Sequence, residues 1–121
     1  MPEPTWRRHI RPSELKEMFE KIGASCKIEK PRPTKATLTC RVGSTEISLE
    51  LWEEYPDEYE IHAIKITNPQ AEVKVPLLLV EEQRVGVEES TLIIDIEPPL
   101  YEGKAVEARI KKNGKFSIVV A

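Results

Sequence analysis

The stretch KATLTCRVGSTEISLELW, from Lys35 to Trp52, decides the fold, because its local pattern fixes a piece of tertiary geometry. Apolar and polar residues alternate on both sides of Gly43-Ser44, a dipeptide with the Gly-first composition of a two-residue type II′ turn. Folding at this turn pairs Cys40 with Ile47, Leu38 with Leu49 and Ala36 with Leu51 on one face, and Arg41 with Glu46 on the other. A one-residue slip would move half of the apolar side chains into water. The sequence therefore predicts an antiparallel hairpin in this register.

A helix precedes this hairpin in the sequence. Pro12-Ser13-Glu14 has the composition of a helix start, with Ser13 as the N-cap, and Gly23 is a typical stop. Between them, four apolar residues recur at the spacing of one helical face: Leu15, Met18, Phe19 and Ile22. We expect a helix over 12–23 that packs on a sheet formed by 24–121, with residues 1–11 as a basic arm.

The rest of the chain supplies further short strands. Alternation changes phase between Ile61 and Ile64, which indicates a bulge or a strand buried on both faces. Pro76 places its strand at a sheet edge or splits it, and the polar segment from Glu81 to Ser90 reads as a connection. We predict one α+β domain, 1–121, whose antiparallel sheet of seven or eight strands curls into a barrel or a sandwich.

The last hairpin shows that the burial pattern overrules a favoured turn dipeptide. A two-residue turn at Asn113-Gly114 would place charged residues opposite apolar ones. A three-residue loop, 112–114, with Gly114 left-handed in a G1 bulge, instead aligns the apolar residues as three pairs: Ile110 with Phe116, Ala108 with Ile118 and Val106 with Val120. We expect the second arrangement, with Arg109, Lys111 and Lys115 together on the outer face.

Composition limits the class of protein. Hydrophobic residues make up 40% and charged residues 32%, which is globular rather than disordered. The longest apolar run is far shorter than the roughly 20 residues of a membrane span, and no signal segment is evident, so we expect a cytoplasmic protein without a membrane contact. Abundant charge and the ten prolines resemble the usage of thermophile proteins.

The two cysteines, Cys26 and Cys40, fall in expected strands without metal-ligand spacing. We interpret them as two small buried thiols. A disulfide between neighbouring strands is the alternative.

Residues for catalysis are scarce. The two histidines, His9 and His62, have no neighbouring ligand types at metal-binding spacing, and the five glycines are isolated turn or cap positions rather than a phosphate loop. His62 alternates with apolar neighbours, which is typical of a surface or sheet-face histidine rather than a general base. We therefore expect no cofactor, no metal and no catalytic residues, and we favour a non-catalytic protein over an enzyme.

Charge is unevenly distributed along the chain. Residues 1–42 carry a net charge of +5, residues 43–103 of −12 and residues 104–121 of +4. Internal neutralisation explains this as well as a partner does. If the basic ends converge, they form a nucleic-acid surface with one aromatic among the cations, made of Trp6, Arg7, Arg8, Arg11, Lys27, Lys30, Arg32, Lys111, Lys112 and Lys115.

One segment resembles a known family. The run from Ala108 to Ile118 is similar to the closing A-x-x-x-N-G-x-L motif of α-crystallin-type small heat-shock proteins. It has one residue more before Asn113, and Phe116 stands where the motif has Leu. We assign no family on this motif and carry no chaperone function over.

Taken as a whole, these patterns favour an accessory or adaptor module that docks on a protein partner, with a nucleic-acid-processing assembly as one setting. Direct binding of RNA or single-stranded DNA through the basic ends is the alternative. A small enzyme or ligand-binding barrel is the third, and a deep polar pocket holding His62 or Asp95 would favour it. The sequence leaves the oligomeric state open.

Overall fold

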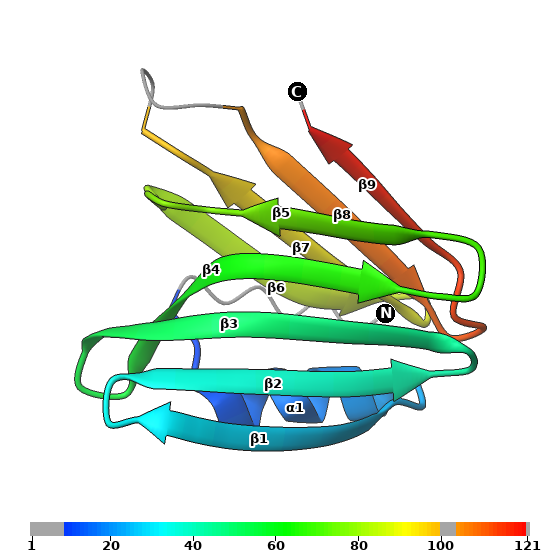
Figure 1. The fold of residues 1–121 in the computed structure, drawn as a ribbon, viewed down its shortest axis with the longest axis horizontal. Helices are drawn as coiled ribbons and strands as arrows, with labels where there is room; N and C mark the ends of the chain where they lie inside the picture. The colour runs from blue at the N-terminus through cyan, green and yellow to red at the C-terminus, as the bar shows by residue number, and fades with distance from the viewer. Residues whose placement is uncertain (1–8, 100–103, 121) are drawn as a thin grey trace.

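The computed structural model describes residues 9–99 and 104–120, which form one helix and two antiparallel sheets (Figure 1). The elements follow the chain in the order α1 (Pro12–Lys21), β1 (Ser25–Arg32), β2 (Lys35–Val42), β3 (Thr45–Tyr55), β4 (Glu58–Thr67), β5 (Glu72–Pro76), β6 (Glu82–Glu88), β7 (Thr91–Glu97), β8 (Val106–Lys111) and β9 (Phe116–Val120). The first five strands make one sheet and the last four make the other, each in sequence order. Strands that are neighbours in a sheet are therefore consecutive in the sequence and antiparallel.

The organising hairpin has the predicted register. Leu38 lies opposite Leu49, and both are fully buried, while Arg41 lies opposite Glu46 with 3.1 Å between Nη2 and Oε2. Gly43 has a φ of +59°, as the first residue of a type II′ turn requires. The alternation of the sequence therefore corresponds to the two faces of β2 and β3.

The helix is shorter than predicted and is capped differently. Arg11 is the N-cap and Pro12 the first helical residue, so the prediction that Ser13 caps the helix is wrong. Proline suits this position because its missing N–H would have no partner there. At the other end Gly23, with a φ of +86°, donates to the carbonyl of Glu20 in a Schellman arrangement. The predicted apolar stripe is confirmed, since Leu15, Met18, Phe19 and Ile22 are buried.

The sheet prediction needs correction, because there are two open sheets and nine strands rather than one curled sheet of seven or eight. The added strand is β6, within the segment expected to be a connection. Its inward side chain Gln83 is buried, accepting the N–H of Ile61 at 2.9 Å and donating to the carbonyl of Tyr59 at 2.7 Å. A glutamine thus takes an inner position of the strand by bonding the backbone of the facing sheet.

The phase change in β4 is a bulge at His62. Glu50 pairs with Ala63 and Leu51 pairs with Ile61, so His62 is the extra residue between them. The bulge lets the residues on both sides of it, up to Ile61 and from Ile64, keep their apolar side chains in the core.

The next strand, β5, is a sheet edge that ends at Pro76. This is the position that the proline predicts, because an edge strand has one side on which no ladder hydrogen bond is needed.

The turn between β8 and β9 fastens the two sheets together at one end. The three-residue loop and its three apolar pairs are confirmed, and Gly114 has a φ of +89°. Thr45, at the start of β3, donates its hydroxyl to the carbonyl of Gly114 at 2.6 Å. A Cβ on Gly114 would lie 2.7 Å from the carbonyl oxygen of Val42, which is closer than real Cβ contacts. The two turns therefore meet backbone to backbone.

The core lies between the two sheets, and α1 covers one side of it. The helix contacts β1 and β2 of the first sheet and β6, the edge of the second (Figure 1). On the opposite side the two sheet edges are β5 and β9, and the described residues place no helix there. The sandwich therefore has a covered side and an open side.

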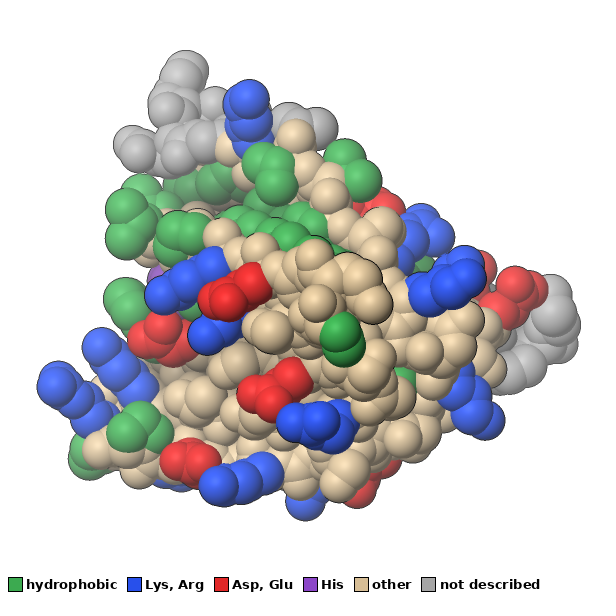
Figure 2. Space-filling view, turned by 45° about the vertical axis from the view of Figure 1, so that its right-hand side comes forward, with side chains coloured by type: hydrophobic (Ala, Val, Ile, Leu, Met, Phe, Trp, Pro, Cys, Tyr) green, Lys and Arg blue, Asp and Glu red, His purple; other side chains and the backbone are tan. Residues whose placement is uncertain are grey.

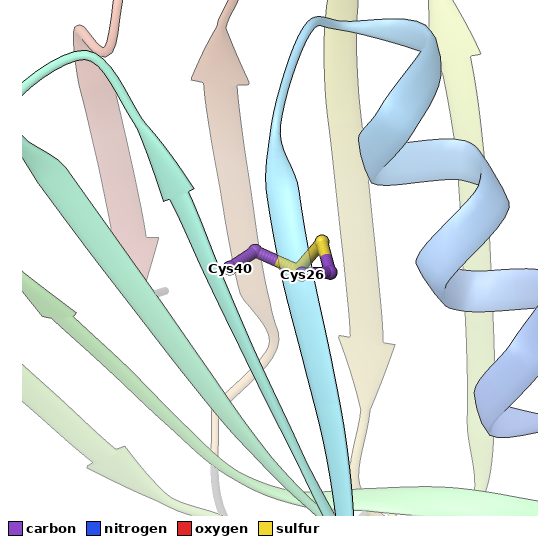
Figure 3. Close-up of a disulfide and its surroundings, with 2 residues drawn as sticks. All are labelled: Cys26 and Cys40. Carbon is purple, nitrogen blue, oxygen red and sulfur yellow. A yellow bond between two sulfur atoms is a disulfide. The ribbon is translucent and has the colours of Figure 1, made fainter.

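The cysteine interpretation is wrong, because Cys26 on β1 and Cys40 on β2 form a disulfide (Figure 3). The two residues are direct cross-strand partners, which brings their side chains onto the same face. Disulfides are typical of oxidising compartments and also of intracellular proteins of hyperthermophiles. The cytoplasmic location therefore stays an expectation.

Candidate functional site

Seven of the ten residues predicted to bind nucleic acid belong to the part of the chain that the structure describes. Three belong to a segment outside the described residues: Trp6, Arg7 and Arg8. The others lie at the start of α1 (Arg11), along β1 (Lys27, Lys30 and Arg32) and around the β8–β9 turn (Lys111, Lys112 and Lys115).

The basic residues of β1 lie at different distances from the β8–β9 turn. A Cβ on Gly23 would lie 3.7 Å from Cε of Lys112, so this turn is next to the start of β1. Arg32 ends the same strand, roughly 20 Å away at about 3.3 Å per residue. Lys27 is paired with Glu29 at 2.9 Å, a hydrogen bond and charge that raise the pKa of the lysine. The nucleic-acid hypothesis stays a prediction.

The surface around the β8–β9 turn carries both signs of charge. A shallow hollow of about 760 Å³ there is lined by acidic and basic side chains, among them Glu88, Glu89, Arg109, Lys111 and Lys112. Arg109 is itself bound to Glu107 at 2.8 Å. A smaller hollow of about 270 Å³ places Phe116 beside Arg109, Lys111 and Lys115. Acidic groups this close weaken attraction for a polyanion.

The open side of the sandwich contains an apolar groove of about 490 Å³, which we call the open-side groove. One side of the groove is the end of β5 and the segment that follows it. The other side is the start of β8 and the end of β9. Its lining is formed by Val75, Pro76, Leu77, Leu78, Leu79, Pro98, Lys104, Val106 and Val120.

Apolar side chains in and beside this groove are unusually exposed. Leu78 is 82% exposed, Leu79 51% and Val120 50%. Hydrophobic side chains gather in the upper part of the face in Figure 2, the level at which β5 and β9 end in Figure 1. Contiguous exposed apolar surface of this kind marks interaction sites in soluble proteins.

A second site lies on the outer face of the first sheet, around His62. The bulge presents the imidazole to this face, where it stacks on Trp52 of β3 with ring centroids 4.1 Å apart. Lys35 of β2 covers the same indole, with Nζ 4.6 Å from the ring centroid. The imidazole side chain is only 5% exposed. Asp95 lies on the other sheet, in β7.

Both ring nitrogens of His62 have partners. Nδ1 lies 2.6 Å from the carbonyl oxygen of Leu77, and Nε2 lies 3.3 Å from Glu60 Oε1 and 3.8 Å from Glu54 Oε1. Glu54, Glu60 and His62, which we call the His62 cluster, offer ligand atoms within 4.8 Å of one another. Burial raises the pKa of the Glu60 carboxyl, the charge of Glu54 raises it further, and the hydrogen bond with His62 opposes both.

Sequence reasoning missed both of these sites. For the His62 cluster a signal was present, since Glu60 and His62 are two apart on one strand and a bulge was expected beside them. For the open-side groove the signal was the run Pro76 to Leu79 in an edge strand and the segment after it, but the facing strand could not be inferred from local pattern.

Comparisons with protein-family models, with curated proteins and with solved structures give no match to this chain. Within the described residues, α1 is too short and too polar to cross a membrane. A function can therefore be proposed only from the geometry of the open-side groove and the His62 cluster.

Proposed function

We propose that the protein is a non-catalytic docking module whose open-side groove binds an extended apolar segment of a partner protein. The observation that carries this proposal is the exposure of Leu78, Leu79 and Val120 beside the groove.

Apolar occupancy is favoured because the groove continues the core of the sandwich. Val75 and Val120 stand at its two sheet edges, and Val106, on the groove floor, is almost fully buried. Val75 packs against the core cluster but remains partly exposed. An apolar side chain fully removed from water here contributes about 1.5–3 kcal/mol, so several of them, with backbone hydrogen bonds, are needed to offset the cost of association.

An extended conformation is favoured because both flanking strands are sheet edges. Within the described residues β5 pairs only with β4, and β9 pairs only with β8. Half of the backbone groups of each edge strand point away from the sheet and can accept an added strand. Pro76 removes one donor from β5, so β9 is the better edge for pairing.

A carboxylate on the partner segment is favoured by the charge of the groove. Lys104 is the charged residue among those that line it, and the described lining includes no acidic side chain. The expected partner segment therefore combines apolar residues at alternate positions with an Asp, a Glu or a free C-terminus.

Peptide selection tests this proposal directly. Random peptides displayed on phage are selected on the wild-type protein and counter-selected on Val120→Asp, and enriched peptides are measured by fluorescence polarisation. We expect alternating apolar sequences with an acidic residue. Leu79→Asp and Val120→Asp should weaken binding at least about tenfold, because a charge enters an apolar contact. Lys104→Glu should weaken it severalfold.

The matched control is Val119→Asp, on the same strand. Val119 is 57% exposed, and neighbouring residues of a strand point to opposite faces, so this variant carries the same change away from the groove. Its binding should equal that of the wild type. Equal loss in Val119→Asp and Val120→Asp would contradict the groove. Failure to enrich any peptide, together with a stable dimer in solution, would assign the apolar surface to a second copy of the chain instead.

A further inference from the structure

We propose that Glu54, Glu60 and His62 form a binding site for one divalent transition-metal ion of the zinc class. This site lies on the outer face of the first sheet, and it shares Leu77 with the open-side groove but does not rest on the proposed docking function.

The hydrogen bond to Leu77 fixes which nitrogen of His62 carries a proton. A backbone carbonyl can only accept a hydrogen bond, so Nδ1 is the donor in the 2.6 Å contact. In the neutral imidazole Nε2 is then an unprotonated acceptor. In this tautomer the lone pair of Nε2 points toward the carboxylates, with Glu60 Oε1 at 3.3 Å. A metal ion binds a histidine through such a lone pair.

The spacing of these atoms fits a metal ion. Two ligands that each lie 2.0–2.1 Å from a tetrahedral zinc ion are roughly 3.3 Å apart. His62 Nε2 and Glu60 Oε1 already have this separation, and Glu54 Oε1 is 3.8 Å from Nε2. The Glu54 side chain is 45% exposed, so it can move the remaining distance without disturbing the core.

The surroundings of His62 resemble the support of a metal ligand. Metal-binding histidines commonly donate their second ring N–H to a carbonyl, which fixes the tautomer and the ring orientation. Here Leu77 provides that carbonyl, and the stacked indole of Trp52 holds the ring plane. The contacts that hold the ring are therefore on its face, from Trp52, and on Nδ1, from Leu77. Both leave Nε2 facing the carboxylates.

The donor set selects the class of ion. One imidazole nitrogen suits zinc, cobalt, nickel or copper rather than magnesium or calcium, which prefer oxygen alone. The two carboxylates supply two negative charges, which balance a divalent ion when the imidazole is neutral. Three protein ligands leave a fourth position for water, on the side where Glu54 is exposed.

Titration with Zn²⁺ alone tests the proposal, using isothermal calorimetry at pH 7.5 and the full-length chain. We expect one ion per chain and a rise in melting temperature, because the ion binds the folded state. Glu60→Gln should weaken binding at least tenfold, and His62→Gln should weaken it further. The matched control is Glu50→Gln, the same charge change on β3, where Glu50 accepts the indole N–H of Trp52. This control should bind zinc as the wild type does.

A second readout uses the indole that stacks on His62. The chain has two tryptophans, so Trp6→Phe leaves Trp52 as the single emitter. Co²⁺ should quench its fluorescence saturably, and Zn²⁺ should compete for the same site. Because Glu54 is largely exposed, Glu54→Gln keeps the test valid if the His62 variant fails to fold. Absence of stoichiometric Zn²⁺ binding in the wild type, or equal affinity in the wild type, Glu54→Gln and Glu60→Gln, would overturn the proposal.

Discussion

Replacing Gly114 with alanine should be among the most damaging single-methyl additions to this fold. The backbone of Gly114 is left-handed, with a φ of +89°, and an L side chain in that region costs about 1–2 kcal/mol. The new methyl group would also lie 2.7 Å from the carbonyl oxygen of Val42 and 3.1 Å from Oγ1 of Thr45. Because the nearest atom is backbone, relief requires one of the two turns to move.

Movement of the turn adds a second cost. The hydroxyl of Thr45 donates to the carbonyl of Gly114 at 2.6 Å in a buried position, and leaving such a group without a partner costs about 1–3 kcal/mol. Conformation and lost hydrogen bond together give an expected destabilisation of about 2–5 kcal/mol for Gly114→Ala. Gly23→Ala is the matched control. Its φ is +86°, but its methyl would meet only the flexible side chain of Lys112, with Cε at 3.7 Å and Cγ at 3.9 Å, so only the conformational cost of about 1–2 kcal/mol applies.

Urea unfolding at 25 °C of the wild type and both variants measures these costs. The slopes should agree, so that midpoints report stability alone. Thr45→Val removes the hydroxyl at nearly constant volume, and its effect should not add to that of Gly114→Ala, because both break the same hydrogen bond. If Gly114→Ala were no more destabilising than Gly23→Ala, the close contact between the turns would be refuted.

Two further changes test the packing and the covalent link. Phe19→Ala should lower stability by about 3–5 kcal/mol because the ring is fully buried. Lys21→Ala, on the exposed face of the helix, should change stability by less than about 0.5 kcal/mol. Equal melting temperatures of the two variants in a thermal scan would contradict the packing of α1. Replacing Cys26 and Cys40 together with alanine should cost about 3 kcal/mol in urea unfolding under oxidising conditions, through the freed unfolded chain, and thiol titration of the folded wild type should detect no free thiol. Two reactive thiols in that titration would contradict the disulfide.

The alternation and spacing of apolar residues predicted those parts of the fold that depend on residues close in sequence. Both hairpins, the apolar face of the helix and the edge position of Pro76 depend on residues close in sequence, and all are confirmed. The strand β6 was missed because Gln83 occupies an inner position through bonds to Tyr59 and Ile61, which belong to the facing sheet. In a sequence pattern a glutamine indicates a surface position, because the backbone groups that satisfy its buried amide are not visible in the sequence.

The sites depended on longer-range geometry, to different degrees. The disulfide was within reach, since extending the alternation from Leu38 and Ile28 to the next inner pair places Cys26 opposite Cys40. For the His62 cluster, the orienting carbonyl comes from Leu77, fifteen residues later. The open-side groove needs the separation into two sheets, which a pattern of alternating residues cannot distinguish from a single curled one.

The contact between the turns also bears on the open-side groove. The two sheets are fastened where Gly114 meets Val42 and Thr45, and the open-side groove lies at the far end of the same β8–β9 hairpin. The two ends of this hairpin therefore differ. Its turn is held by backbone contact with the first sheet, whereas Val120 at its other end is half exposed and borders the groove. A segment bound in the groove would therefore contact the end of the hairpin that is farther from this contact.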